Sequence, residues 1–303
     1  MAAAAAALGL SLVLLAGCGG QEASGPEPEG APPQPGGELS IAVDGRIRTI
    51  DPLFASSRAE RLASRQVYEP LVSRQNGPFG QTRRLPGLAR RLQSNENATL
   101  WSLRLRDGVS FADGELLDAD AVKANAERWM SAHVVPGLNF VDSPRPGLVR
   151  FFLDRPDAGF ARTLAQPRLG LVASGAISSG VAGIGVGEWG TGPFELRERR
   201  GRDVVLARNA GWWGTPLGLG PGVDQIALHG SGSSAIRAEQ LESGQVRVAD
   251  ELDHGGADAA AADPLLTTIN GDGETMGLER SVRGIDTAAA GQSLSDVWFS
   301  DIG

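Results

Sequence analysis

The sequence predicts an α/β fold with a mixed sheet and some α+β character. Segments in which apolar and polar residues alternate are typical of half-buried strands, and other segments place apolar residues at the spacing of a helix. The two kinds of segment follow one another along the chain with Gly and Pro between them. The composition is that of a globular domain, because 41% of the residues are hydrophobic and 21% are charged.

The N-terminal segment predicts export and lipid attachment. Residues 1–17 are nearly all apolar or small and carry no charged side chain, so they are too short for a bilayer span and suit a removable signal peptide. Leu15-Ala16-Gly17-Cys18 resembles the lipobox of bacterial lipoproteins, which implies that Cys18 is the lipidation site. Cys18 is the only cysteine, which excludes a disulfide framework. Residues 18–37, rich in Pro, Gly and Glu, predict a tether.

The expected elements follow from residue 38 onward. Leu39, Ile41 and Val43 alternate with small or polar residues and predict a first strand, and residues 58–72 predict a helix that ends near Tyr68. A strand is expected at 101–105, with a hairpin through Asp107-Gly108 into 109–111. A helix follows, capped by Asp118 or Asp120, in which Val122, Ala126, Trp129 and His133 recur at helical spacing. The remaining expected elements are strands at 149–153 and 204–206 and a helix at 236–241. Residues 255–262 contain only Ala, Gly and Asp and predict weak structure.

The charge balance limits the partners. The formal net charge is −8 and the isoelectric point is near 5.0, which argues against a nucleic-acid partner. A group of arginines is interpreted as a solvated face rather than a binding patch; it comprises Arg83, Arg84, Arg90 and Arg91.

Three stretches carry a family resemblance. The first runs from Leu100 to Gly114 (LWSLRLRDGVSFADG) and continues into DADAV at 118–122, the second joins GTGPF at 190–194 to VVLARNAGWWG at 204–214, and the third is RAEQLESGQV at 237–246. Together they resemble the extracytoplasmic solute-binding proteins, family 5, that serve ABC importers of peptides and nickel. One departure is Arg247, where the family usually has Asp.

The resemblance implies a periplasmic-binding-protein-like fold of type II. Family members are longer and enclose a solute between two lobes, whereas we expect here a single lobe at 38–250 that lacks most of the second. Residues 251–278 are expected to form a weakly structured connection in place of that lobe, and residues 279–303 a return segment. In the peptide binders of the family, the charged groups that hold peptide termini come largely from the second lobe, so none is carried over.

The resemblance also implies a function. It is that of a lipid-anchored, extracytoplasmic solute-binding component of an ABC importer, with a peptide or other small solute, permease subunits and the membrane as partners. The alternative is a descendant of the fold that acts as an interaction or scaffold lipoprotein without tight solute binding. Candidate ligand-facing residues at loop ends are Tyr68, Glu69, Thr191 and Trp212, although Tyr and Trp at turns often only fill core space.

Other patterns favour structural interpretations. Residues 185–190 match GxGxxG, but Pro193 opposes the helix that a dinucleotide site needs. The three histidines are far apart, the acidic group at 250–254 is interpreted as a solvated loop, and residues 270–274 as a turn, so no metal site is expected. Because Ser231, Ser233 and Ser234 lack a nucleophile elbow, no catalytic residue, cofactor or enzyme activity is predicted.

Overall fold

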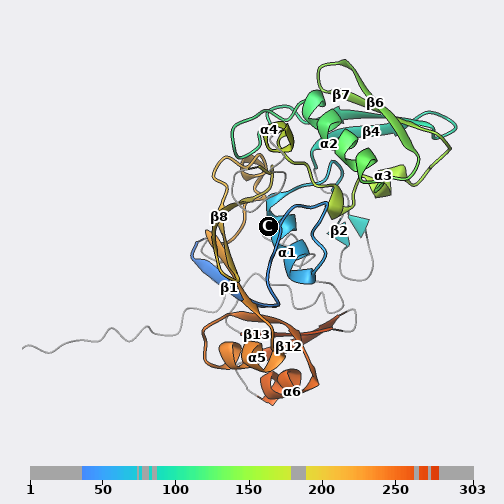
Figure 1. Cartoon of the computed structure of the whole chain (residues 1–303). Coiled ribbons are helices and arrows are strands. Elements are labelled where there is room, and N and C mark those ends of the chain that lie inside the picture. The colour runs from blue at the N-terminus through green and yellow to red at the C-terminus, as the bar shows by residue number, and fades with distance from the viewer. Residues whose placement is uncertain are drawn as a thin grey trace, which may run out of the picture. The chain divides into compact units, whose positions relative to one another are not determined.

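The computed structural model describes residues 36–73, 75–76, 82–83, 87–178, 189–262, 266–271 and 274–279 (Figure 1). These residues all belong to one compact unit. The predicted signal peptide at 1–17, Cys18, the predicted tether up to residue 35, residues 185–188 of the GxGxxG match and the predicted return segment from residue 280 lie outside the described residues.

A mixed sheet of seven strands forms the larger part of the fold. Its strand order is β12-β13-β11-β1-β10-β9-β8. The central strand β1 runs parallel to β10 on one side and to β11 on the other, and the outer pairs are antiparallel. This confirms the expected α/β class with a mixed sheet. The strands are β1 (Glu38–Asp44), β8 (Phe194–Arg200), β9 (Asp203–Arg208), β10 (Gln225–Ser231), β11 (Val248–Leu252), β12 (Leu266–Gly271) and β13 (Glu274–Glu279).

A second sheet has four antiparallel strands in the order β4-β5-β7-β6. Its strands are β4 (Ala89–Ser94), β5 (Leu100–Leu105), β6 (Leu138–Arg145) and β7 (Leu148–Leu153). One face packs on helix α2 (Ala119–Ser131) through a core that includes Trp129, Phe151 and Phe160. A short ladder of β2 (Gln75–Asn76) and β3 (Thr82–Arg83) completes the strands of the described residues.

Helix boundaries follow local capping chemistry. Helix α1 (Arg58–Val67) begins with a capping box, in which Ser57 and Glu60 satisfy each other's backbone N–H groups. It ends at Val67, close to the expected end near Tyr68, because Tyr68 is extended and Glu69 precedes Pro70, where the helical backbone is disfavoured. Asp118 caps α2 as expected. The remaining helices are α3 (Phe160–Thr163), α4 (Ser174–Ser178), α5 (Ser234–Glu242), α6 (His254–Ala262) and the 3-10 turns Pro167–Leu169 and Thr215–Leu217.

Strand β1 is buried on both faces, which explains its central position. Ile41 and Val43 point into the core that α1 covers, whereas Ala42 packs against Ala238 and Leu241 of α5 on the other face. Each such aliphatic side chain contributes roughly 1.5–3 kcal/mol when it is fully buried. The small side chain of Ala42 allows α5 to approach the sheet closely.

Two expectations about local structure are wrong. Residues 109–111 form no hairpin with β5, because β5 is already paired on both edges with β4 and β7; instead Leu117 donates its N–H to the Val109 carbonyl at 2.9 Å. Residues 255–262 are not weakly structured but lie in α6, and the other described residues of 251–278 include the end of β11, all of β12 and most of β13. Alanine favours helix, and α6 gains packing against α5, β12 and β13 (Figure 1).

Within the described ranges, we find no helix with the length and hydrophobicity that a bilayer crossing requires.

Candidate functional site

The carboxyl ends of three parallel strands meet at one edge of the seven-stranded sheet. They are Asp44 of β1, Ser231 of β10 and residues 250–252 of β11. The chain leaves β10, passes through α5 and returns as β11 on the far side of β1. In open α/β sheets, ligands bind outside the carboxyl ends of strands where neighbouring connections run in opposite directions. A ligand site is therefore expected at this carboxyl edge.

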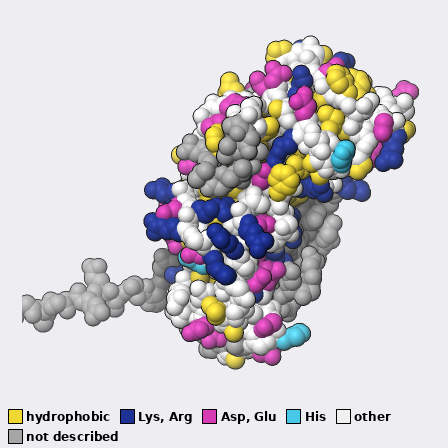
Figure 2. All heavy atoms as spheres, viewed as in Figure 1, with side chains coloured by type: hydrophobic (Ala, Val, Ile, Leu, Met, Phe, Trp, Pro, Cys, Tyr) yellow, Lys and Arg dark blue, Asp and Glu magenta, His cyan; other side chains and the backbone are white. Residues whose placement is uncertain are grey.

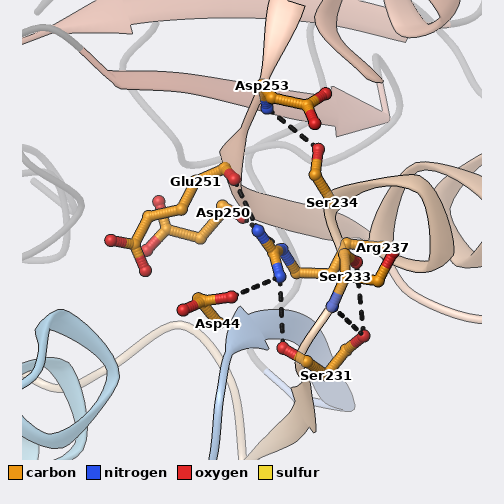
Figure 3. Close-up of polar contacts among 8 residues, drawn as sticks. All are labelled: Asp44, Ser231, Ser233, Ser234, Arg237, Asp250, Glu251 and Asp253. Carbon is orange, nitrogen blue, oxygen red and sulfur yellow. Dashed lines mark hydrogen bonds and ion pairs between the residues drawn. The ribbon is translucent and has the colours of Figure 1, made fainter. Parts of the chain in front are cut away.

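Arg237 of α5 joins the three strand ends (Figure 3). Its Nη1 donates to Asp44 Oδ1 at 2.7 Å and to the Ser231 carbonyl at 3.1 Å. Its Nε donates to the carbonyl of Asp250 at 2.9 Å, and Nη2 donates to that of Glu251 at 2.6 Å. The residue is only 3% exposed, so these hydrogen bonds replace the ones to water that the guanidinium loses when it is buried.

A second arginine neutralises Asp250. Asp250 is 1% exposed, and its carboxylate accepts a hydrogen bond of 2.8 Å from Nε of Arg58, which is the first residue of α1. Burial raises the pKa of Asp250, and Arg58 is the strongest influence that lowers it. Asp250 is therefore not in a solvated loop as expected, whereas Asp253 and His254 of the same acidic group are exposed.

The backbone is strained beside this pair. Glu251 has a φ angle of +53°, a left-handed backbone conformation that residues other than Gly rarely adopt. The conformation coincides with the hydrogen bond that its carbonyl accepts from Arg237 Nη2. Burial and then the nearby Asp250 raise the pKa of Glu251. Such strain persists only where the surroundings determine it, and it is frequent at binding sites.

A cavity of about 420 Å³ opens beside this edge. It is bounded by the β8–β9 turn, the end of β10 and the first turns of α5, and it is lined by Arg202, Gly230, Ser231, Gly232, Ser233, Ile236 and Gln240. A side chain at Gly230 would lie 2.5 Å from the Gly45 carbonyl and 2.7 Å from that of Arg202, so only Gly fits there. The lining is mainly apolar and includes residues with hydroxyl, amide and guanidinium groups, a combination that is typical of small-solute sites.

The four residues expected to face a ligand lie elsewhere. The structure brings three of them together, because Glu69 Oε2 accepts a hydrogen bond from Trp213 Nε1 at 2.8 Å and a longer one from Trp212 Nε1 at 3.4 Å, with Thr191 beside it. Burial raises the pKa of Glu69 to about 7, and the hydrogen bonds from Trp213 and Trp212, together with the nearby Thr191 hydroxyl, oppose the rise.

Tyr68 is separate from that group. It lies in the core of the seven-stranded sheet with 2% exposure, and Thr191 and Trp212 are buried as well. Their burial favours the interpretation that these side chains fill core space. A ligand-facing role for the four remains a prediction.

Sequence reasoning missed the roles of Arg237, Arg58 and Asp44. Arg237 opens the third family-like stretch, at 237–246, but nothing in that stretch marks it as buried. A signal was present, because Arg237 shares a helical face with Ala238 and Leu241, where a charged residue among apolar ones needs a partner. The partners come from 13 and 193 positions away in the chain, and local patterns do not show such pairs.

Comparison with known proteins identifies the family. The model of the bacterial extracellular solute-binding proteins, family 5, middle part, matches residues 84–280. The chain belongs to this family. The match includes the four-stranded sheet, β8 to β11 and the α5 segment that carries Arg237.

Two curated relatives illustrate the similarity. The chain is 28% identical over 226 residues to the probable D,D-dipeptide-binding periplasmic protein DdpA of Escherichia coli, a match that covers 71% of this chain and 43% of DdpA. It is 26% identical over 223 residues to the glutathione-binding protein GsiB of Escherichia coli, a match that covers 70% of this chain and 42% of GsiB. The chain thus spans less than half the length of these relatives.

Solved structures share the fold. NikA from Brucella suis, in complex with Fe(III)-EDTA, superposes with a TM-score of 0.67 at 24% identity over 77% of this chain and 48% of NikA. DppA from Helicobacter pylori, in complex with the peptide STSA, has a TM-score of 0.67 at 18% identity over 78% of this chain and 50% of DppA. These similarities confirm the periplasmic-binding-protein-like fold.

Proposed function

We propose that this chain is a solute-binding component of an ABC-type importer and that its solute is a peptide. The observation that carries the proposal is the open cavity at the carboxyl edge, in a chain of the solute-binding family. A peptide presents amide donors and acceptors along its length, which Ser231, Ser233 and Gln240 can match, and a terminal carboxylate, which Arg202 can pair. The permease subunits of the importer are the expected protein partners.

Binding is tested by titrating the full chain with peptides, nickel chelates and sugars while thermal stability is followed. A ligand at 100 times its dissociation constant stabilises by about 2.7 kcal/mol. We expect peptides to raise the melting temperature. A flat response to all three classes contradicts the proposal.

A matched pair of variants locates the site. Gly232→Val places a side chain within the cavity, where even the Cβ atom lies 3.5 Å from the Arg202 guanidinium. Gly220→Val adds the same atoms at a position with no neighbour within 4 Å of the new Cβ. We expect the first variant to lose the peptide response and the second to keep it. Equal responses would place the solute elsewhere, including the surface near Glu69 and Trp212.

We further propose that the chain is anchored outside the cytoplasmic membrane through acylated Cys18. The support is the lipobox-like sequence at 15–18 and the secreted character of the family. Mass spectrometry of the protein from membranes should show a chain that begins at Cys18 with fatty acyl groups, and Cys18→Ser should abolish the modification. An unmodified chain that retains residues 1–17 contradicts this proposal.

The alternative function is an interaction or scaffold lipoprotein without tight solute binding. It is favoured by the cavity walls, which come only from the β8–β9 turn, β10 and α5, whereas tight sites surround most of a small solute. This function predicts recovery of a membrane protein partner together with no response to any solute. A measurable solute affinity without such a partner counts against it.

A further inference from the structure

The outer face of the four-stranded sheet carries a row of arginines, here called the arginine row, which comprises Arg91, Arg104 and Arg145. Strand register places Arg91 of β4 opposite Arg104 of β5, Arg104 opposite Leu148 of β7, and Leu148 opposite Arg145 of β6. One line across all four strands therefore carries three positive side chains. The neighbouring residues Leu103, Leu105 and Val149 point to the opposite, buried face.

The arginine row differs from other arginines near this sheet. Arg150, in the next line across the sheet, binds Asp142 through two hydrogen bonds, of 2.8 and 2.5 Å. Arg90, beside Arg91, pairs with Asp107 at 2.9 Å. The three arginines of the row are exposed, and no carboxylate of the described residues forms an ion pair with them.

This arrangement opposes the stability of the fold. Like charges directly opposite each other on neighbouring strands are destabilising, and Arg91 and Arg104 are such a pair. The chain as a whole has a formal charge of −8, so basic residues are in the minority. A row of unpaired cations that costs stability is expected where an anion completes it.

A second cavity lies over the row. It has a volume of about 190 Å³ and is lined by Arg91, Gln93, Ser102, Arg104, Arg145 and Leu148. Gln93 and Ser102 face each other across β4 and β5 in the line next to the arginines. The volume equals that of roughly six liquid water molecules, so a tetrahedral oxyanion fits with part of its hydration. Guanidinium forks, a hydroxyl and an amide are the donors that phosphate oxygens accept.

We propose that the arginine row is a binding site for a phosphate group. It lies on a different sheet from the carboxyl-edge cavity, and the proposal does not depend on the solute-binding role. The phosphate belongs either to a soluble ion or to the headgroup of an anionic lipid. In both cases the phosphate oxygens pair with Arg91, Arg104 and Arg145.

The test is a calorimetric titration of the full chain with inorganic phosphate and with pyrophosphate. Sodium chloride at matched ionic strength is the reference. We expect saturable binding that chloride does not reproduce. The Arg91→Gln/Arg104→Gln variant should raise the dissociation constant at least tenfold, because it removes two charge-assisted contacts to the phosphate oxygens. The single variant Arg145→Gln should show a smaller rise and serves if the double variant folds poorly.

The control variant is Arg155→Gln/Arg197→Gln, which removes two exposed arginines outside the row. It lowers the net charge equally and should bind phosphate as the unchanged protein does. Equal weakening in the row and control variants would show a general charge effect and overturn the proposal. So would the absence of saturable binding by phosphate, pyrophosphate and lipid vesicles alike.

Vesicles separate the two sources of the phosphate. The full chain with Cys18→Ser, which excludes acylation, is mixed with vesicles of phosphatidylglycerol or of phosphatidylcholine. Retention on phosphatidylglycerol alone, lost when Arg91 and Arg104 are replaced, assigns the site to a lipid headgroup. Binding of pyrophosphate without retention on either vesicle assigns it to a soluble phosphate compound.

Discussion

The two sheets place their arginines in opposite environments. At the carboxyl edge of the seven-stranded sheet, Arg237 is 3% exposed and donates to Asp44 and to three carbonyl groups. On the outer face of the four-stranded sheet, Arg104 is exposed and lies opposite Arg91. Basic side chains are also prominent on the surface seen in Figure 2, beside acidic ones. The comparison teaches that the same residue type stabilises where it completes a network and destabilises where it meets its own charge.

Replacement of Arg237 is expected to have the largest effect. Arg237→Met leaves the carbonyl groups of Ser231, Asp250 and Glu251 without their donor, next to the charge of Asp250. Because each buried group left without its hydrogen-bond partner costs about 1–3 kcal/mol, the total loss should be about 3–5 kcal/mol. Urea denaturation measures the loss. Arg237→Lys should recover only part of it, because an ammonium cannot reproduce the fork, and a loss below about 1 kcal/mol would contradict the role assigned to Arg237.

Replacement of Gly190, at the junction between the two regions, is expected to have the next largest effect on stability. Gly190 accepts a hydrogen bond from the Ala112 N–H on one side, and a Cβ atom added to it would lie 1.9 Å from the Val67 carbonyl at the end of α1. Gly190→Ala must therefore shift backbone and should cost about 3 kcal/mol, the upper part of the range for overpacking. Gly220→Ala is the control, because its added Cβ meets nothing within 4 Å. Similar melting temperatures for the two variants would contradict this packing.

The Glu69 cluster predicts a pH dependence. The folded-state pKa of Glu69 is raised from 4.5 to about 7, so the folded chain holds the proton more tightly than the unfolded chain does. The stability that this proton contributes is fully present below about pH 4.5 and is lost as the pH rises towards 7.

Glu69→Gln isolates this contribution. Between pH 5 and 8 the unchanged protein should lose on the order of 2 kcal/mol relative to the variant, since one pKa unit corresponds to about 1.4 kcal/mol. Denaturation of both proteins across this range gives the difference directly. Parallel stability curves would mean that the pKa of Glu69 is close to its ordinary value. Trp212→Phe is a useful companion, because it removes only the longer indole bond.

The smallest expected effect has the opposite sign to that of Arg237. Arg104→Gln relieves the repulsion between Arg104 and Arg91 and should stabilise the anion-free protein by about 0.5 kcal/mol at low salt. The gain should shrink as salt increases, because screening weakens the repulsion. Melting temperatures at two salt concentrations measure it. Destabilisation by Arg104→Gln without phosphate would show that the row is not under electrostatic strain.

Much of the fold was predictable because the signals are local. The alternation at 39–43 and 101–105 and the helical spacing from Asp118 identified β1, β5 and α2, whose apolar faces are indeed buried. Helix α6 was not predictable, since a run of Ala, Gly and Asp has no distinct apolar face. It becomes a helix where α5 and the β12–β13 hairpin lie against it.

The sequence by itself determined the family, the α/β class and the strands and helices with clear periodicity, because these depend on residues close together in the chain. Only the tertiary structure decided which charges meet. Arg237 reaches Asp44 across 193 positions, and Arg104 meets Arg91 through strand register. Burial and register are properties of the assembled sheets. They decide whether an arginine is paired within the chain or lies exposed beside another positive charge.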